Sequence, residues 1–156
     1  YLDLGREDKA LALADELGSR IGPDPQVYSK LVAAQVELAK GQPQTAVALL
    51  AEAQGLLDTW LGRFLLGRAY LEAGAFTEAH SEFEGCLERR GEATALFLDD
   101  VPTYHYLPPV NYYLGRALEG LGSPAAAESY NTFLEIKANG DARPLLADAR
   151  RRVSEQ

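Results

Sequence analysis

The stretch that decides the fold is Trp60–Leu87, which reads WLGRFLLGRAYLEAGAFTEAHSEFEGCL. It contains two helical patterns, and Ala73-Gly74-Ala75 separates them. Apolar residues recur at helical intervals in both patterns, and Gly67 places no side chain on one face of the first pattern. A glycine and an alanine such as Ala79 at facing points let two antiparallel helices approach closely. The stretch therefore predicts a helical hairpin, and because one hairpin cannot bury both of its faces, it also predicts further copies.

The residue types and spacings of this stretch resemble the tetratricopeptide repeat. The resemblance is carried by Leu66-Gly67-x-x-Tyr70, by Gly74 and by Ala79-x-x-x-Phe83. Two positions depart from the family pattern: Arg63 stands where a bulky aromatic residue is expected, and the closing proline is replaced near Gly91. The resemblance implies an all-α fold, a short right-handed solenoid of antiparallel helical hairpins that ends in a C-terminal capping helix.

Copies of the hairpin recur along the chain at similar spacings. The predicted helix breaks are Gly5, Gly41, Gly74 and Gly122, and the predicted packing alanines are Ala10, Ala46, Ala79 and Ala127. Both sets are separated by 36, 33 and 48 residues. Two of these spacings lie close to the family period of about 34 residues, and the third exceeds it by about 14. The excess predicts an insertion and not a lost repeat.

The spacings divide the chain into one tetratricopeptide-like domain, residues 1–156. Its predicted parts are a partial repeat at 1–18, repeats at 26–55, 57–88 and 108–137, an insertion at 89–107 and a capping helix at 141–154. Outside the central stretch, the predicted helices are 8–17, 26–39, 43–54, 110–120, one that starts at Pro124, and 144–153.

Composition excludes several classes of protein. The chain has 156 residues with a formal net charge of −8, which argues against a nucleic-acid partner because such proteins gather Lys and Arg on one face. The basic cluster Arg150–Arg152 is interpreted as the C-terminal end of a helix. Cys86, the single cysteine, excludes an internal disulfide and is interpreted as a core residue. No apolar run approaches the roughly 18 residues of a membrane span.

The resemblance implies a concave groove, lined by the first helix of each hairpin, that contacts peptides or helices. The residues expected to face this groove are Tyr28, Leu31, Gln35 and Leu38 in one repeat, Leu61, Phe64, Arg68 and Leu71 in the next, and Tyr112, Arg116 and Glu119 in the last. Arg68 and Arg116 each follow a Leu-Gly pair, so they occupy corresponding places. Two arginines along one groove would select a carboxylate or an acidic side chain, with Phe64 and Tyr112 as apolar anchors. The alternative is that each arginine pairs with a glutamate such as Glu72 or Glu119 and only keeps the surface soluble.

The insertion at 89–107 is too apolar for a free loop, because it contains Phe97, Tyr104, Tyr106 and Leu107. We expect it to pack on a neighbouring helix or to lie across the mouth of the groove. Its other notable residues are Asp99, Asp100 and His105. Without a second group of ligands these are interpreted as turn-capping residues, and no metal or other cofactor is expected.

Catalysis has little support in the sequence. The chain has two histidines, His80 and His105. His80 lies beside the packing Ala79 and is interpreted as an exposed side chain and not as a base, and no nucleophile with an orienting base is visible. No strand followed by a glycine-rich phosphate loop is visible. We therefore expect a protein that is not an enzyme.

Three hypotheses about function follow. The first is a protein-interaction module that binds a peptide or a partner domain in its groove, as part of a larger protein. The second is a structural role, in which the parent chain or another copy fills the groove, so that the chain self-associates. An enzyme or nucleic-acid binder built from helical hairpins is a third hypothesis, for which neither a basic groove nor a cluster of titratable residues is found.

The parent protein is a further expectation. The chain begins with Tyr1-Leu2-Asp3 and contains no Met, so we expect it to be a piece of a longer polypeptide. The last repeat, from Leu107 to Leu134, resembles the C-terminal repeat regions of bacterial signalling proteins of the serine/threonine-kinase or winged-helix-regulator type. That resemblance implies a cytoplasmic location. A periplasmic lipoprotein repeat is the alternative if a signal precedes the chain.

Overall fold

The computed structural model describes residues 1–96, 107–137 and 144–155, and every regular element in these ranges is helical. The elements are a 3₁₀ helix η1 (Leu2–Leu4) and the α-helices α1 (Glu7–Gly18), α2 (Pro23–Ala39), α3 (Pro43–Leu56), α4 (Trp60–Glu72), α5 (Phe76–Glu88), α6 (Arg90–Leu96), α7 (Leu107–Gly120), α8 (Ala126–Ile136) and α9 (Pro144–Glu155). The predicted all-α class is therefore confirmed. The chain divides into two compact units, Tyr1–Ala75 and Phe76–Gln156.

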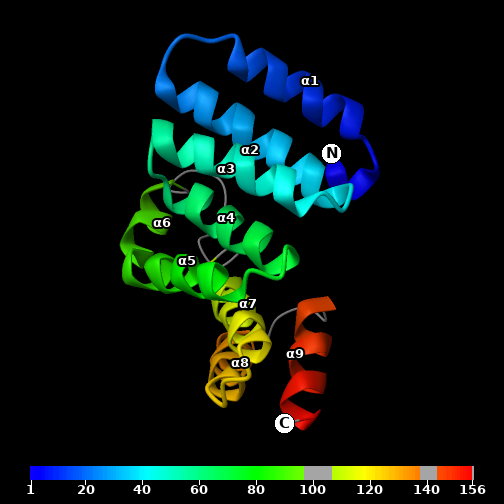
Figure 1. The fold of residues 1–156 in the computed structure, drawn as a ribbon, viewed down its shortest axis with the longest axis vertical. Coiled ribbons are helices and arrows are strands. Elements are labelled where there is room, and N and C mark those ends of the chain that lie inside the picture. The colour runs from blue at the N-terminus through cyan, green and yellow to red at the C-terminus, as the bar shows by residue number, and fades with distance from the viewer. Residues whose placement is uncertain (97–106, 138–143, 156) are drawn as a thin grey trace. The chain divides into compact units, whose positions relative to one another are not determined.

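In the first unit, consecutive helices pack as pairs. Each of α1, α2 and α3 packs against the helix that follows it, and α2 also contacts α4. Figure 1 shows these helices lying side by side. Their core contains the fully buried side chains of Val27, Leu31, Leu50 and Trp60. Thr59 caps the start of α4, since its hydroxyl oxygen accepts a hydrogen bond from the Gly62 amide at 3.0 Å.

Each hairpin turns at a glycine in the left-handed conformation. At Gly41, where φ is 71°, the Gly41 amide donates to the Leu38 carbonyl at 3.0 Å, and the Gln42 amide donates to the Glu37 carbonyl at 2.8 Å. This pair of bonds defines a Schellman helix end. The φ angles at the other three predicted breaks are 65° at Gly5, 76° at Gly74 and 67° at Gly122. All four predicted breaks are therefore confirmed, because the backbone there adopts a conformation that favours glycine.

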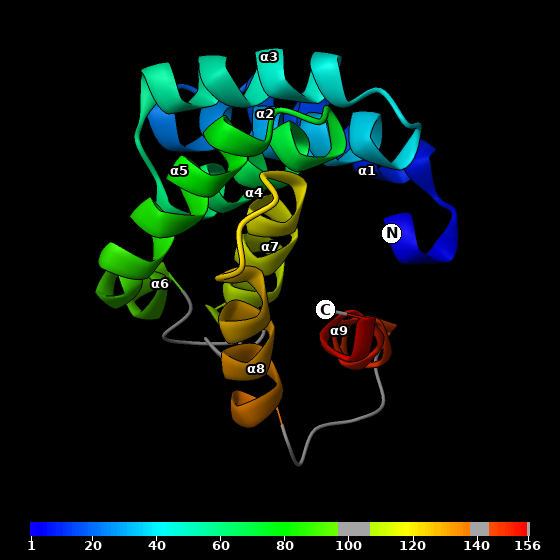
Figure 2. The same cartoon turned by 60° about the horizontal axis from the view of Figure 1, so that its bottom comes forward.

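In the second unit, α5 packs on α7, α7 on α8, and α9 on both α8 and α7. Figures 1 and 2 both show α7 and α8 side by side. The hydrophobic cluster between α7, α8 and α9 is built around Tyr112, Tyr130, Phe133 and Leu146. Gly115 allows α7 to approach α8 closely, because a Cβ atom at this position would lie 2.7 Å from the Tyr130 ring.

Several boundaries differ from the prediction. Helix α2 begins at Pro23 and not at residue 26, since a proline is well tolerated in the first turn, where its missing N–H would have no partner in the helix. For the same reason α7 includes Pro108 and Pro109 in its first turn. The predicted packing alanine Ala127 is half-buried, and Ala126 takes the buried place, because the chain makes a further turn before α8 begins.

The segment predicted as an insertion contains an unexpected helix. Helix α6 covers Arg90–Leu96 and buries Ala93 completely, and Arg89 forms an ion pair with Glu92 at 2.6 Å at its start. The expectations for Phe97, Asp99, Asp100, Tyr104, His105 and Tyr106 lie outside the described residues. Within the described ranges, no helix combines the length and the apolar character that a membrane crossing requires.

Candidate functional site

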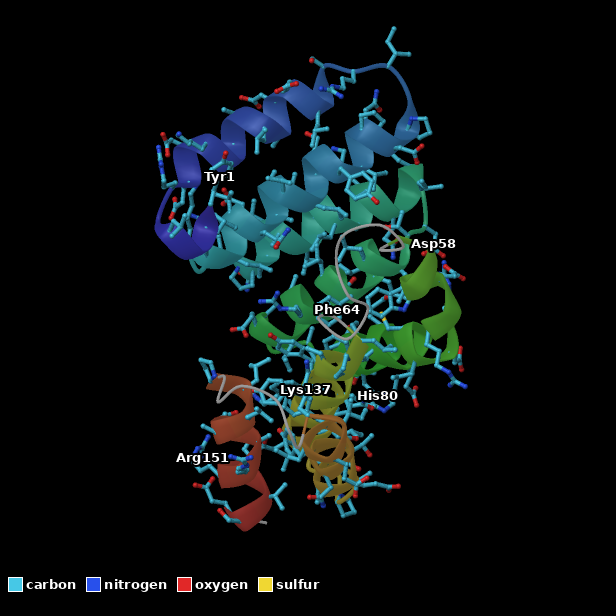
Figure 3. The ribbon with its side chains drawn as sticks, turned by 180° about the vertical axis from the view of Figure 1, so that it is seen from behind. Tyr1, Asp58, Phe64, His80, Lys137 and Arg151 are labelled. Atoms are coloured by element: carbon cyan, nitrogen blue, oxygen red, sulfur yellow. The ribbon has the colours of Figure 1, made fainter. Side chains whose placement is uncertain are left out.

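An open groove of about 580 Å³ lies in the first unit, and we call it the first-unit groove. Elements from distant parts of that unit form its walls. It is lined by Tyr1 and Leu2 of the N-terminal segment, Ala10 and Leu13 of α1, Val32, Gln35, Leu38 and Ala39 of α2, and Arg68 and Glu72 of α4. Figure 3 labels Tyr1, whose ring lies 5.9 Å from the Lys9 ammonium nitrogen.

The lining combines an apolar surface with a few polar groups. Leu13 is 43% exposed, so it offers apolar area to a ligand. The Gln35 amide nitrogen donates a long hydrogen bond of 3.4 Å to the Leu31 carbonyl within α2. Arg68 and Glu72 lie one helical turn apart on α4. A guanidinium, an amide and a carboxylate beside apolar side chains can orient a peptide by its polar groups while the apolar side chains contribute contact area.

Gln35, Leu38 and Arg68 are the residues expected from the sequence that line this groove. Tyr28 is half-buried on α2 and does not line it.

Leu31, Phe64 and Leu71 were expected to face the groove, and this expectation of exposure is wrong. Their side chains are 1%, 2% and 5% exposed. The Phe64 ring stacks on Trp60 at a centroid distance of 5.7 Å, with an angle of 9° between the planes. Apolar residues surround α4 on every side, so the sequence pattern did not show which of its faces is covered.

Tyr1, Leu2 and Leu13 line the groove without having been predicted. Leu13 lies on the apolar side of its helix, together with Ala10, Ala14 and Leu17.

Three further expected residues, Tyr112, Arg116 and Glu119, lie on α7 in the second unit, where α9 contacts Tyr112 and Glu119. The Tyr112 hydroxyl donates to Asp148 Oδ2 at 2.7 Å, and Arg116 Nη1 donates to the Tyr112 hydroxyl at 3.3 Å. Glu119 Oε2 accepts hydrogen bonds from Tyr130 at 2.6 Å and from Arg152 Nη1 at 2.5 Å. Because Tyr112 is 3% exposed, it is not available as an apolar anchor for an outside ligand in this arrangement.

The electrostatics of these contacts favour charged carboxylates and neutral tyrosines. Burial disfavours the charged form of Asp148, but hydrogen bonds from Arg152, Tyr112 and Arg151 outweigh this effect and hold the pKa of that carboxyl well below its usual range. Burial has the same effect on Glu119, and hydrogen bonds from Tyr130 and Arg152 outweigh it and lower its pKa.

Burial and the hydrogen bonds to these carboxylates raise the pKa of both tyrosines that contact them. For Tyr112 the carboxylate is Asp148, and for Tyr130 it is Glu119. Both phenols therefore stay protonated at neutral pH and act as hydrogen-bond donors. We call the set Tyr112, Glu119, Tyr130, Asp148 and Arg152 the α9 clasp.

The chain was compared with protein-family models, with curated proteins and with solved structures, and nothing matched in any of the three comparisons. Among the residues that the structure describes, there is no group of three or more His, Cys, Asp and Glu side chains that could hold a metal ion.

Proposed function

We propose that this chain is a helical-repeat interaction module of a larger protein, and that its first-unit groove binds a peptide or a partner segment that carries a carboxylate beside an apolar side chain. The observation that carries the proposal is that Gln35 of α2 and Arg68 of α4 line the same groove as the exposed Leu13. The arginine supplies a charge-assisted hydrogen bond to the carboxylate, and the leucine supplies apolar contact.

A tetratricopeptide-like solenoid is the architecture that we propose for this module. Two observations support it. The four glycine breaks have the same left-handed geometry, and two of the three spacings between them, 36 and 33 residues, lie near the family period of about 34. In the first unit α2 and α3 pack together and α3 packs on α4, and in the second unit α7 and α8 pack together and α8 packs on α9, so consecutive helices stack as a solenoid requires.

The test is selection of binding peptides from a displayed random library on the wild-type chain. We expect the selected peptides to share an acidic residue or a free C-terminal carboxylate next to an apolar residue. Arg68→Glu should weaken their binding roughly 10- to 100-fold, because a charge-assisted hydrogen bond is worth about 1.5–3 kcal/mol. Gln35→Ala, a milder change in the same groove, should weaken it less.

Arg20→Glu is the matched control. Arg20 is exposed, pairs with Glu16 at 2.7 Å and does not line the groove, so this change should leave binding unchanged. Circular dichroism of each variant checks that it remains folded. Peptides without a carboxylate, or equal binding to wild type and a folded Arg68→Glu variant, would contradict the proposal.

A second candidate function is supported by the second unit. There the chain's own α9 contacts the α7 residues that the sequence assigned to a groove. This arrangement favours a structural role for that surface, in which the chain fills its own recognition face. The two functions are compatible because they concern different units.

A further inference from the structure

We propose that the face formed by α7 and α8 is a recognition surface for an amphipathic helix, and that α9 is its built-in occupant, which a partner helix of matching chemistry can replace. The proposal concerns the second unit alone and does not depend on ligand binding in the first-unit groove. It rests on the contacts of α9, which show which side chains this surface accepts.

The apolar part of the surface accepts two small or medium side chains one turn apart. Leu146 and Ala149 of α9 are 3% and 0% exposed, and they pack in one cluster with Tyr112, Tyr130 and Phe133. The rings of Tyr112 and Phe133 lie 5.6 Å apart, so this part of the surface is aromatic.

The polar part of the surface accepts an acidic residue and an arginine four positions later. Asp148 accepts the hydrogen bond of the Tyr112 hydroxyl, and Arg152 donates to Glu119. Within α9, Arg152 Nε also donates to Asp148 Oδ2 at 2.5 Å, which holds both side chains in the geometry that the surface requires. The pattern recognised is therefore Leu, then Asp two residues later, Ala three residues later and Arg six residues later.

Helix α9 buries few of its side chains, so a partner helix can replace it. Of its 12 residues, Leu146 and Ala149 are the buried ones, whereas α4 of the first unit buries eight of 13. Arg151, labelled in Figure 3, is half exposed, and its ion pairs join residues of α9 to one another, Asp148 and Glu155. These pairs stabilise the helix but do not attach it to α7 or α8.

The fit is also incomplete near the C-terminal end of α9. An open cavity of about 530 Å³ is lined there by Val153 together with Glu119, Pro124, Ala126 and Ala127. A helix with a larger apolar side chain at the position of Val153 would fill more of this cavity. The favoured partner is therefore an amphipathic helix with the α9 pattern and a bulky residue seven positions after the leucine.

The test uses a fluorescent peptide with the sequence of residues 144–155 and the full chain. In the wild type the attached α9 competes at an effective concentration of about 1 mM, so the peptide should bind weakly. In a chain carrying Asp148→Asn and Arg152→Gln, which weaken the internal occupant by removing its charges, the peptide should bind at least tenfold more tightly. A peptide with Val153→Phe should bind both chains more tightly than the unchanged peptide.

A charge exchange identifies the site of binding. Glu119→Arg in the chain with the weakened α9 should lower affinity for the peptide at least tenfold, and a peptide with Arg152→Glu should recover it. Arg150→Ala is the matched control in the chain, because Arg150 is exposed and takes no part in the α9 clasp. Circular dichroism checks each chain, and Leu146→Ala provides a second way of weakening α9 if the double variant loses its helical signal.

Equal affinity for wild-type chain and weakened chain would overturn the proposal. Absence of binding at about 1 mM peptide to a folded weakened chain would also overturn it, as would failure of the exchanged charges to restore affinity.

Discussion

Gly115→Ala tests the packing of the second unit most directly. Gly115 lies in the middle of α7, where alanine is intrinsically favoured over glycine by about 1 kcal/mol, so helix propensity alone predicts a stabilised protein. The structure predicts the opposite result. An added Cβ atom would lie 2.7 Å from Cε1 and 2.8 Å from Cδ1 of Tyr130, and ordinary contact begins at 3.4 Å. The ring would have to move by about 0.7 Å, the difference between 3.4 Å and 2.7 Å.

The Tyr130 ring has little freedom to make this movement. It is fully buried, its hydroxyl donates to Glu119 at 2.6 Å, and the Tyr112 ring lies 6.0 Å from it. Overpacking of a core costs about 1–3 kcal/mol, and a shifted ring also weakens the hydrogen bond to a charged carboxylate. After the propensity gain of about 1 kcal/mol is subtracted from the overpacking cost, and because the weakened hydrogen bond adds to that cost, we expect Gly115→Ala to lower the free energy of unfolding by about 1–2 kcal/mol.

Urea denaturation followed by circular dichroism measures this change. The matched control is Gly55→Ala in α3, where no heavy atom lies within 4 Å of the added Cβ atom, so a gain of up to about 1 kcal/mol is expected. Adding Tyr130→Leu to Gly115→Ala should make the alanine less costly than it is alone, because the leucine removes the ring. If Gly115→Ala stabilises the chain as Gly55→Ala does, the inference that α7 and α8 approach closely at Gly115 is wrong.

Three further changes should have measurable effects. The pKa of Asp148 is lower in the folded chain than in the unfolded one, so its contribution to stability is present at neutral pH and is lost as the pH falls below about 4. In urea denaturation, the stability of Asp148→Asn should therefore depend less steeply on pH below about 4 than the stability of the wild type does. Thr59→Ala removes the cap on the Gly62 amide and should cost about 1 kcal/mol in thermal unfolding, whereas Thr59→Ser should retain most of the stability. Gly41→Ala places a residue with a Cβ atom in the left-handed region and should lower the free energy of unfolding by about 1–2 kcal/mol, although the space around Gly41 is open. If urea denaturation shows a smaller loss for Gly41→Asn than for Gly41→Ala, the cost comes from the backbone conformation.

The glycine breaks could be predicted from the sequence because they depend on local backbone geometry. Gly41 and Gly74 end their helices with the same hydrogen bonds, and both positions require φ near 70° whatever packs around them. The short helix α6 could not be predicted in the same way. Its glycine, Gly91, has no left-handed φ and lies within the helix, so a residue type that marked breaks elsewhere was misleading there.

The candidate site could be predicted only in part, because exposure depends on what covers each face. Gln35 and Arg68 were expected in the groove from their places in the repeat pattern, and both line it. Phe64 and Leu71 lie on the same helix as Arg68 and are buried, since α4 is apolar on all sides and its neighbours decide which side remains open.

Arg68 and Arg116 show why correspondence in sequence does not establish a shared role. Both follow a Leu-Gly pair, and the sequence therefore assigned them to one kind of site. In the structure Arg68 lines an open groove, whereas Arg116 donates to Tyr112, whose hydroxyl in turn donates to Asp148 of α9. The contact with Asp148 joins residues 36 positions apart, and no periodic pattern encodes such a pair. Binding of a ligand near Arg116 therefore depends also on the free energy that releases α9 from Tyr112.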